Sequence, residues 1–472
     1  MESFQKSFDV IVVGAGTGGT TAARFTAQKG LDVCLIDRKE RSQIGNKICG
    51  DAVGTEIFDI LNINHPKEDE LSCHIKGAKL YSPNLNKCIT LTDPKQAGYE
   101  INRLEFGQRL LNEALDAGVK QFLDNTIALD LLYKDNSVSG LKIRVKNGEK
   151  IDLNSKIIID ASGFYSPLRK EIKSSIIEKE ISKEDCILCY REIVKFNPQD
   201  QQVNDPDYIT IIMDQEKAPG GYIWYFPRNE SSVNIGLGMF MDYKGQVKEY
   251  YQKNVFNEFI KTKKYEVIST GGGVVSVRRP IWSSADNGIM FVGDAACHVN
   301  PLHGGGIDPS MRAGYYAALT ALDAIQNEDY SLKKLWEYNC KIINSFGAEF
   351  ASLDLLRIAL QKLSNKSLNF GLEKDLLSGD EILEIAATGG IKLSIMDMLT
   401  KAIKGISNPK LLLDLNYLRI KMNDLRSHYK NFPKNIEEIS EFDAWKEYTK
   451  NIYNKIKFTS FGKSIHKENK NI

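Results

Sequence analysis

The sequence lacks the features of a membrane-spanning or secreted protein. It contains no run of about 18 apolar residues, the length that a spanning helix requires. Residues 1–9 are polar and lack the basic and then apolar layout of a secretion signal. The eight cysteines are scattered through 472 residues rather than grouped as a disulfide framework. We therefore expect a cytoplasmic protein.

The sequence also lacks an excess of positive or negative charge and a cluster of metal ligands. The 62 Lys and Arg residues nearly balance the 61 Asp and Glu residues, so the net charge of +1 creates no field that attracts nucleic acid. Cys186 and Cys189 have C-x-x-C spacing, but no second pair or histidine cluster completes a metal site. On a strand their side chains point to opposite faces. We expect neither a nucleic-acid partner nor a metal.

The chain does have a strand–helix–strand pattern around a glycine-rich loop. Residues 8–13 form an apolar, β-branched run that predicts a buried strand. The loop at residues 14–19 follows, and the sequence then predicts a helix over residues 20–29 and a second strand over residues 32–37. A unit of about 30 residues with this order is typical of dinucleotide binding.

The glycines of this loop have distinct roles in holding a pyrophosphate. Gly14 and Gly16 allow a tight turn and a close approach of the backbone to the phosphates, and Gly19 lets the helix pack on the strand. Asp37 ends the second strand, where a carboxylate accepts hydrogen bonds from the adenosine ribose. The alternative interpretation is a glycine-rich turn beside a surface aspartate.

Later segments indicate FAD rather than NAD. Residues 288–296 repeat the strand-then-turn pattern and place Asp294 where it can bind the ribityl chain. The glycine loop at residues 301–307 opens the next helix, and its amides can face the flavin ring. Arg103, at a predicted helix start, can meet the phosphates. Each segment taken alone is equally typical of a structural role.

In this order and spacing the segments resemble the glutathione-reductase-type FAD fold of aromatic hydroxylases, over residues 8–320. The resemblance implies an α/β protein with a Rossmann-type FAD-binding domain, an inserted β-rich substrate domain and a C-terminal helical domain. The expected division is 1–170 and 276–330 for the two parts of the FAD-binding domain, 171–275 for the β-rich domain and 331–472 for the helical domain.

Three further segments resemble the geranylgeranyl reductase family, most closely its archaeal lipid-saturating branch. They are residues 47–51 (KICGD), 219–227 (PGGYIWYFP) and 300–306 (NPLHGGG), and the match extends to residues 351–366. The resemblance implies an oxidoreductase of isoprenoid membrane-lipid biosynthesis that hydrogenates geranylgeranyl double bonds with reduced FAD. The FAD contacts that it implies are Gly18, Asp37, Cys49, Gly50, Ala52, Arg103, Ala128, Asp294, Gly306 and Ile307.

An aromatic row in the second of these segments is the predicted substrate contact. Tyr222, Trp224 and Phe226 alternate along the chain, so on a strand they share one face. Such a row can wall an apolar tunnel over the flavin, because burial of a prenyl chain gains about 0.8 kcal/mol per CH₂. The alternative is ordinary core packing of aromatic side chains. The family resemblance favours the tunnel.

Saturation of an isolated alkene requires a hydride from the flavin and a proton from an acid close to the bound chain. Cys49 is the first candidate acid, because its Cys-Gly turn is expected near the flavin ring, although a thiol is weakly acidic, with a reference pKa of about 8.5. Tyr222 or water can contribute, and His303 is a candidate for catalysis or for positioning. The alternative for Cys49 is that it only shapes the flavin pocket.

The C-terminal third carries an excess of positive charge. Residues 392–434 contain nine Lys or Arg against three Asp or Glu, and residues 446–472 contain seven against two. One interpretation is peripheral contact with an anionic membrane surface. The other is a helical bundle with a solvated basic face. The apolar residues at helical spacing in this region are Leu411, Leu415, Leu418, Met422 and Leu425.

Two rival functions share the same motifs. The first is a flavin monooxygenase or halogenase, because Trp224-x-Phe226-Pro227 resembles the W-x-W-x-I-P pattern of halogenases, with Tyr222 in place of the first Trp. The second is a non-catalytic lipid-binding flavoprotein. Since the sequence has no second G-x-G-x-x-G, we expect the electrons to come from a transient external donor, NAD(P)H or ferredoxin. The expected substrate is a prenylated lipid.

Overall fold

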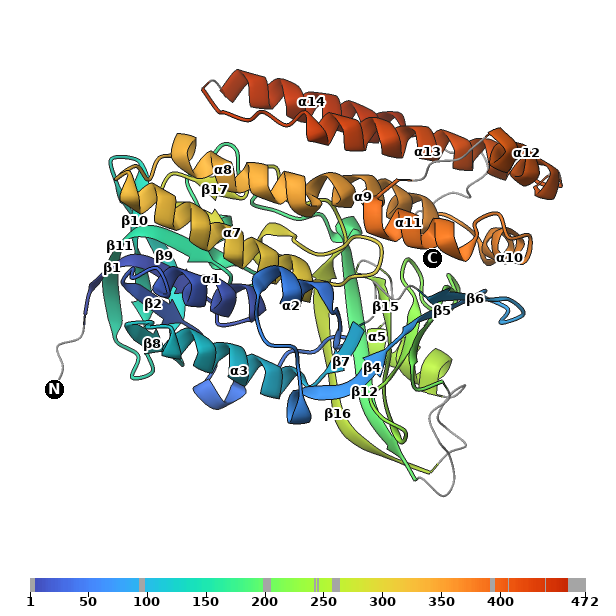
Figure 1. Cartoon of the computed structure of the whole chain (residues 1–472), viewed down its shortest axis with the longest axis horizontal. Coiled ribbons are helices and arrows are strands. Elements are labelled where there is room, and N and C mark those ends of the chain that lie inside the picture. The colour runs from blue at the N-terminus through green and yellow to red at the C-terminus, as the bar shows by residue number, and fades with distance from the viewer. Residues whose placement is uncertain are drawn as a thin grey trace.

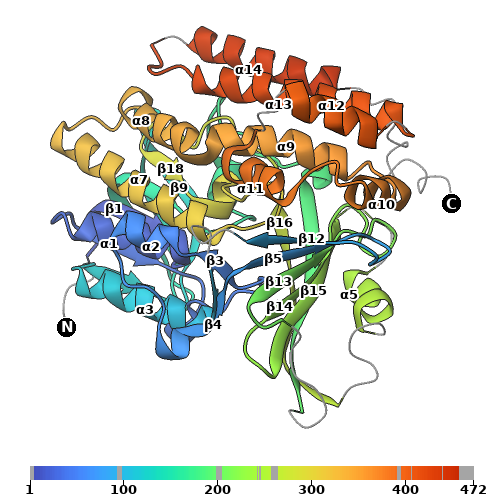
Figure 2. The same cartoon turned by 45° about the vertical axis from the view of Figure 1, so that its right-hand side comes forward.

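The structure is a computed structural model that describes residues 5–92, 98–197, 205–241, 243, 246–256, 264–390, 395–405, 407–437 and 439–456. Figure 1 shows three regions: an eight-stranded sheet with its helices, a seven-stranded sheet, and a layer of C-terminal helices that covers one side of both. Figure 2, turned by 45°, shows the same layer with α13 and α14 outermost.

The eight-stranded sheet has the strand order β17-β18-β11-β1-β2-β8, and β10 and β9 continue from β11 as an antiparallel extension. The central strands β1 and β2 are almost wholly buried, as expected for parallel strands that are covered on both faces. The strand bounds are β1 Ser7–Val13, β2 Val33–Ile36, β8 Gln121–Leu123, β9 Ile127–Lys134, β10 Ser137–Arg144, β11 Lys150–Asp160, β17 Ala285–Asp286 and β18 Ile289–Phe291.

The strand order reverses at β1, which pairs in parallel with β11 on one side and with β2 on the other. A crevice for a ligand forms at such a switch point, outside the carboxyl ends of the strands. Gly14 follows β1 and Asp37 follows β2, so both lie at this edge. Helix α1 (Thr17–Ala27) begins three residues before the predicted position 20, because the glycine-loop residues 17–19 are already helical.

Helix α7 (Ile307–Gln326) brings the second glycine loop to the first. It crosses α1 at Gly18 and Gly314, where a Cβ on Gly314 would lie 2.2 Å from the Gly18 carbonyl oxygen. Only glycine allows this approach of the two helices. The other helices of this region are α2 (Glu56–Leu61), α3 (Arg103–Asp116) and α4 (Pro167–Glu171).

The seven-stranded sheet has the order β16-β12-β15-β14-β13-β5-β6. Strands β5 and β6 come from residues 1–170, which the sequence assigned to the first part of the FAD-binding domain. They join this sheet because β5 pairs in parallel with β13. The four-part division of the chain stays a prediction, and the strand pairing places these two strands outside its first part. The bounds are β5 Gly77–Tyr81, β6 Cys88–Thr92, β12 Cys186–Phe196, β13 Tyr208–Ile212, β14 Ile223–Pro227, β15 Ser232–Phe240 and β16 Tyr265–Ser276.

A small sheet of order β3-β7-β4 lies between the two large sheets (Figure 1). Its strands are β3 (Ala52–Gly54), β4 (Leu71–Ile75) and β7 (Gly98–Ile101). The segment of residues 47–51 leads directly into β3, so this sheet positions the predicted Cys-Gly turn. The short helix α5 (Val247–Tyr251) packs on β12 and β15 of the seven-stranded sheet.

The apolar face of α13 packs inward. Leu411, Leu418, Met422 and Leu425 are buried, Leu415 packs against the same core, and α13 contacts α9. This face therefore belongs to the helical bundle, as the second interpretation predicted. None of the described helices is both long and apolar enough to cross a bilayer. The helices of this layer are α8 Leu332–Ile342, α9 Ala348–Leu360, α10 Asn365–Glu373, α11 Gly379–Thr388, α12 Ile395–Lys404, α13 Pro409–Lys430 and α14 Ile439–Lys455.

The basic residues beyond position 456, which the sequence included in the final charged stretch, lie outside the described residues.

Candidate functional site

The first glycine loop has the shape of a phosphate cradle. A Cβ on Gly14 would lie 2.4 Å from the Ala161 carbonyl oxygen, and one on Gly19 would lie 1.7 Å from the Gly14 carbonyl oxygen. A Cβ on Gly16 would meet no atom within 4 Å, so open space lies directly in front of this residue. The loop is therefore closed on the protein side and open where a pyrophosphate would approach.

Asp37 braces this loop. One carboxylate oxygen accepts a hydrogen bond from the Ala15 N–H at 2.7 Å, and the other accepts one from the Lys39 N–H at 2.8 Å. Each oxygen keeps a further lone pair that can accept a ribose hydroxyl. Ala128, the other residue predicted on this side, is buried in β9, and the nearby Thr126 N–H donates to the Asp37 carbonyl.

Two helices direct their amino ends toward the same crevice. No side chain caps α1 at Gly16 or α7 at Gly306, so the first amides of both helices are available to an anion. Asp294 lies beside the second of these ends, 3.5 Å from where a Cβ on Gly306 would be. Asp294 also forms an ion pair with Lys47, in which the Lys47 Nζ lies 2.7 Å from a carboxylate oxygen. The sequence predicted Asp294 but not its link to residues 47–51.

The two halves of the crevice are joined by buried polar contacts. Arg169 donates to the Ala295 carbonyl at 2.7 Å, and its backbone N–H donates to Ser166. Ser166 in turn donates to the buried carboxylate of Asp160, at the end of β11. These residues hold the turn that carries Asp294 against the end of β11.

Cys49 is held by a network around Asp51. The Cys49 thiol donates to an Asp51 carboxylate oxygen at 2.9 Å, and the Asp51 N–H donates back to the sulfur at 3.2 Å. Arg103 approaches the same sulfur at 3.7 Å, and its buried Nε has no partner among the described residues. Arg103 therefore faces the Cys-Gly turn and keeps a donor for a further group, which fits the predicted phosphate contact.

Burial and the neighbouring Asp51 carboxylate raise the pKa of the Cys49 thiol to about 12. The thiol consequently keeps its proton at neutral pH. Gly50, the next residue, lies against the aromatic row, because a Cβ at this position would be 2.8 Å from the Phe226 ring.

The aromatic row forms as the alternation predicts. The Tyr222 and Trp224 ring centroids are 6.2 Å apart, and those of Trp224 and Phe226 are 6.4 Å apart. Gly236 on β15 leaves room for the indole, because a Cβ there would be 2.5 Å from the Trp224 ring. Trp224 and Phe226 are 6% and 7% exposed. The tunnel that this row would wall stays a prediction.

The aromatic row and the Cys-Gly turn share one buried amide. Asn234 on β15 accepts from the Trp224 indole N–H at 3.0 Å, and its own N–H₂ donates to the Cys49 carbonyl and to the Asp51 carboxylate. Arg228 donates to the same carboxylate at 2.9 Å. Sequence reasoning missed Asn234, Arg228 and Asp51 as site residues. Of these three residues, only Asp51 could have been suspected from the sequence, because it lies two residues after Cys49.

Tyr222 connects two of the motif segments, residues 219–227 and residues 300–306. The Tyr222 hydroxyl donates to the His303 carbonyl oxygen at 2.6 Å, and burial raises the Tyr222 pKa. The Gly305 N–H donates to His303 Nδ1 at 3.1 Å. The His303 side chain is exposed, and its Nδ1 carries no proton while it accepts this hydrogen bond. His303 is thus a neutral imidazole with its proton on Nε2.

Glu100 is the least satisfied polar group near this site. It lies on β7 opposite Ala52, is 0% exposed, and neither carboxyl oxygen has a hydrogen-bond partner among the described residues. Burial, followed by the charge of Asp51, raises the pKa of Glu100 well above 4.5. The sequence offered no signal for this residue.

Comparisons with known sequences agree with this geometry. A family model described as "Geranylgeranyl reductase catalytic domain" matches residues 185–275, and one described as "FAD dependent oxidoreductase" matches residues 9–164. The digeranylgeranylglycerophospholipid reductase of Sulfolobus acidocaldarius is 35% identical over 97% of this chain and 99% of the relative. The protein of the same name from Methanothrix thermoacetophila is 31% identical over 87% of this chain and 99% of the relative.

Comparisons with solved structures agree as well. A geranylgeranyl bacteriochlorophyll reductase-like protein from Thermoplasma acidophilum matches with a TM-score of 0.73 and 27% identity, over 88% of this chain and 100% of that protein. A myxobacterial chondrochloren halogenase matches with a TM-score of 0.59 and 16% identity, over 84% of this chain and 97% of that protein. The second match reflects the fold alone. The predicted fold class is confirmed.

Alanine at Gly16 is expected to block FAD without disturbing the fold. The new methyl group would enter the open space of the cradle, and the fold should lose at most about 1 kcal/mol from the poorer helix cap. FAD affinity should fall about tenfold or more in a fluorescence titration. Gly19→Ala is the comparison, because its methyl group would strike the loop backbone and lower the thermal midpoint of the apoprotein. Full FAD affinity in Gly16→Ala would contradict this prediction.

Glu100→Gln is expected to flatten the pH dependence of stability. Below the unfolded pKa of about 4.5 both states hold the proton, so the variant and the wild type should respond alike to pH. Above it only the unfolded chain releases the proton, and wild-type stability falls by up to about 1.4 kcal/mol per pH unit until the folded carboxyl ionises. The gain in thermal midpoint of E100Q should therefore grow with pH. The exposed Glu230→Gln is the control, and parallel profiles for E100Q and wild type would contradict the assignment.

Proposed function

Because the chain belongs to the geranylgeranyl reductase family, we propose that it saturates the isolated C=C bonds of geranylgeranyl chains in isoprenoid membrane lipids or their precursors. It is an FAD-dependent oxidoreductase that acts on C=C bonds. The observation that supports the proposal most directly is the convergence of three motif segments, since Asn234 and Tyr222 tie the Cys-Gly turn and the His303 loop to one aromatic row.

Reduced FAD supplies the hydride for such a reaction when it is bound. The proposed role of Trp224 and Phe226 is to hold the apolar chain and to exclude water, because they are buried on one face next to the Cys-Gly turn. The proposed proton donor is the Cys49 Sγ–H. The Arg103 guanidinium and the Asp51 N–H both reach this sulfur, so they would stabilise the thiolate that remains.

The two other candidate acids have positioning roles in this proposal. The Tyr222 hydroxyl donates a hydrogen bond to the His303 carbonyl oxygen and fixes the glycine loop against the aromatic strand. The His303 ring accepts the Gly305 N–H at Nδ1, so in this arrangement it carries no imidazolium proton to donate. For the external reductant, NAD(P)H and ferredoxin both remain proposals, and the chain carries one glycine-loop motif for FAD only.

The same fold occurs in halogenases, so the chemistry must be tested directly. The experiment is anaerobic incubation of the reduced, FAD-loaded protein with geranylgeranyl lipids, followed by mass spectrometry. The proposal expects the mass of two hydrogens to be added for each saturated bond, with concurrent oxidation of the flavin. A product that forms only with oxygen would favour a monooxygenase or halogenase. Lipid binding with no reaction under any condition would favour a non-catalytic flavoprotein.

Cys49→Ala is expected to lower turnover about 100-fold or more, because a positioned general acid contributes at least that factor. FAD binding should persist, since Asn234 still holds the turn through the residue 49 carbonyl. The measurement is the anaerobic rate of flavin oxidation by a geranylgeranyl lipid, with FAD content determined from absorbance. Cys340→Ala, in α8, is the control for loss of a thiol. Unchanged turnover in C49A would remove Cys49 from the mechanism.

We also propose that the outer face of α13 and α14 contacts the membrane that carries the substrate. Leu413, Ile420 and Tyr448 are 69%, 41% and 53% exposed, so their apolar surfaces are available to a membrane. Leu413 and Ile420 are seven residues apart on the side of α13 opposite its buried stripe. The basic residues of this region would add attraction to anionic lipids.

The membrane contact predicts flotation with anionic phospholipid vesicles at low salt. Replacing Leu413 and Ile420 together by Ser should reduce the bound fraction several-fold, because both apolar side chains would leave the interface. Tyr165→Ser is the control, since Tyr165 is 61% exposed, between Leu413 and Ile420, but lies in the eight-stranded-sheet region. Absence of wild-type flotation at low salt would contradict the proposed contact.

A further inference from the structure

A buried carboxyl group lies where the small sheet meets the seven-stranded sheet. Glu100 on β7 pairs with Ala52 of β3 on one side and with Cys73 of β4 on the other, so the three side chains share one face of the small sheet. The Cys73 thiol donates to the Pro227 carbonyl oxygen at the end of β14, 3.0 Å away. The face that carries Glu100 is therefore turned toward the seven-stranded sheet.

Asp51 lies beside Glu100 at the start of the small sheet. It directly precedes Ala52, the strand partner of Glu100. The next residue on β7, Ile101, donates its N–H to the Asp51 carbonyl oxygen at 3.0 Å. One guanidinium nitrogen of Arg228 lies 2.9 Å from an Asp51 carboxylate oxygen and 3.5 Å from the Ile101 carbonyl oxygen. The backbone on both sides of Glu100 is thus tied to Asp51 and to its arginine.

A second arginine approaches from the seven-stranded sheet. Arg191 on β12 is buried and pairs with Gly236, and Trp224 pairs with Gly236 from the other side. Arg191 therefore shares the face of the sheet that carries the aromatic row. Its other strand partner is Gly271, where a Cβ would lie 2.5 Å from the Ile48 side chain. The segment of residues 47–51 consequently lies over this part of the sheet.

Glu100 and Arg191 keep unsatisfied polar atoms on these two facing surfaces. Among the described residues, neither Glu100 oxygen nor the Arg191 Nε has a hydrogen-bond partner, although another Arg191 nitrogen donates to the Ser269 hydroxyl at 2.8 Å. Burial and then the Asp51 charge raise the pKa of Glu100, against the smaller opposing effects of Arg228 and Arg191. Buried polar atoms of this kind are normally satisfied by ordered water, which takes about two to four polar partners.

Loss of the Cys49 proton would create an excess of negative charge at this point. The Cys49 sulfur lies 2.9 Å from an Asp51 carboxylate oxygen, and a thiolate and a carboxylate this close repel each other strongly. Arg103, 3.7 Å from the sulfur, offsets part of this repulsion. The pair therefore has to receive a proton before the next turnover, and Glu100 is a carboxyl beside it that holds one.

We propose that Glu100 returns a proton to Cys49 after each saturation, through Asp51 and a water molecule bound between them. The Glu100 O–H bond breaks and the Cys49 S–H bond forms, no electrons are transferred, and the negative charge moves to Glu100. There it faces Arg191 and Arg228 until a proton from solvent restores the carboxyl. This inference rests on the proposed function, because it takes Cys49 as the donor to the alkene.

Glu100 acts through Asp51 and not on the alkene itself, so the first turnover separates its role from that of Cys49. The reduced, FAD-loaded protein is mixed anaerobically with a geranylgeranyl lipid. Flavin oxidation measures the first turnover, and product formation with excess dithionite measures the steady state. In Glu100→Gln the first turnover should keep the wild-type rate, because Cys49 already holds its proton. The steady-state rate should fall about tenfold or more.

Glu100→Asp keeps a carboxyl and should recover part of the steady-state rate that Glu100→Gln loses. The exposed Glu230→Gln is the control and should match the wild type in both phases. Equal slowing of the first turnover and of the steady state in E100Q would indicate a purely structural role and overturn the proposal. Wild-type rates of E100Q in both phases would overturn it as well.

The pH profile gives a second readout. The arginines facing Glu100 stay charged, and burial raises the pKa of both nearby thiols, Cys49 and Cys73, to about 12. The wild-type steady-state rate should fall as rising pH ionises Glu100, above the ordinary carboxyl range, and E100Q should lack this fall. The same fall in E100Q would contradict the proposal. The charged and titratable groups that face Glu100 are Asp51 before β3, Cys73 on β4, Arg191 on β12 and Arg228 after β14.

Infrared spectroscopy tests the proton on Glu100 without turnover. In the FAD-loaded protein the C=O band of a protonated carboxyl should be lost in E100Q. The band should shift in Cys49→Ala, which removes the thiol hydrogen bond to Asp51, and stay unchanged in Cys340→Ala. No change of the band in E100Q, with normal saturation by the wild type, would overturn this inference alone. Saturation of no geranylgeranyl lipid by the wild type would overturn the proposed function and this role with it.

Discussion

The Asp51 carboxylate joins the small sheet to the seven-stranded sheet, and the geometry of the site depends on this contact. Asp51 is buried beside β3, yet its oxygens accept from Arg228 at the end of β14, from Asn234 on β15 and from the Cys49 thiol. A buried carboxylate that loses its charged partner costs several kcal/mol, so Arg228 in particular holds Asp51 against the seven-stranded sheet. The positions of the Cys-Gly turn and of the aromatic row are thereby coupled. A shift of either one would leave a buried charge unpaired.

The sequence predicted the parts of the site that depend on local backbone requirements. Gly14 and Gly19 stand where the loop backbone needs a close approach, and the alternation of Tyr222, Trp224 and Phe226 directly implies one face of a strand. Asn234 and Glu100 could not be found in this way. Each is one polar residue within an ordinary strand pattern, and its importance arises only from pairing between strands that are distant in sequence. The place of β5 beside β13 in the seven-stranded sheet could not be found either, because a short apolar run does not specify its partner.

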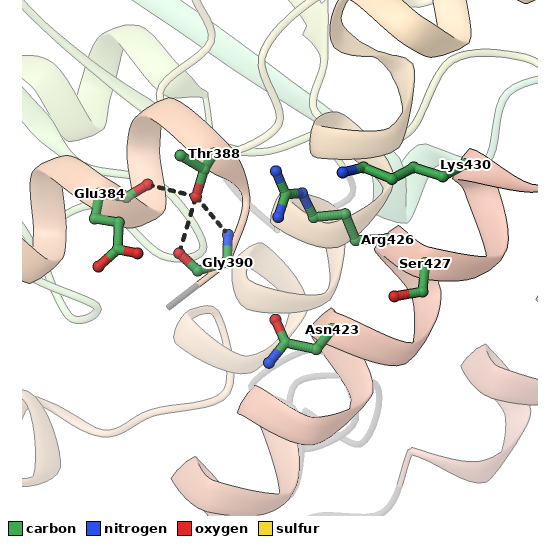
Figure 3. Close-up of a pocket in the computed structure, with 7 residues that line it drawn as sticks. All are labelled: Glu384, Thr388, Gly390, Asn423, Arg426, Ser427 and Lys430. Atoms are coloured by element: carbon green, nitrogen blue, oxygen red, sulfur yellow. Dashed lines mark hydrogen bonds between the residues drawn. The ribbon is translucent and has the colours of Figure 1, made fainter. Parts of the chain in front are cut away.

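The C-terminal helices show how one sequence pattern can serve two surfaces. The spacing of Leu411, Leu418 and Met422 indicated an apolar face, and this face is used for packing on α9. The exposed Leu413 and Ile420 lie between these residues in the sequence and gave no separate periodic signal. The same helix also carries Arg426 and Lys430 toward a cavity at the end of α11 (Figure 3). Its three faces therefore contribute to the core, to the outer surface and to a cavity beside α11, which a count of its charges alone does not reveal.

The two candidate proton donors, Tyr222 and Cys49, differ more in the group that accepts their hydrogen bond than in their pKa. Tyr222 donates to a backbone carbonyl, and delivering this proton would release the loop of His303 from the aromatic strand. The Cys49 thiol donates to Asp51, and a rotation about its Cα–Cβ bond would redirect the proton at the cost of one hydrogen bond to a charged acceptor, about 1.5–3 kcal/mol. Asp51 would keep Arg228 and Asn234 during this rotation, so no buried charge would be left without a partner. A weakly acidic thiol is then a suitable donor, because it retains its proton until an alkene that is accepting hydride draws the proton away.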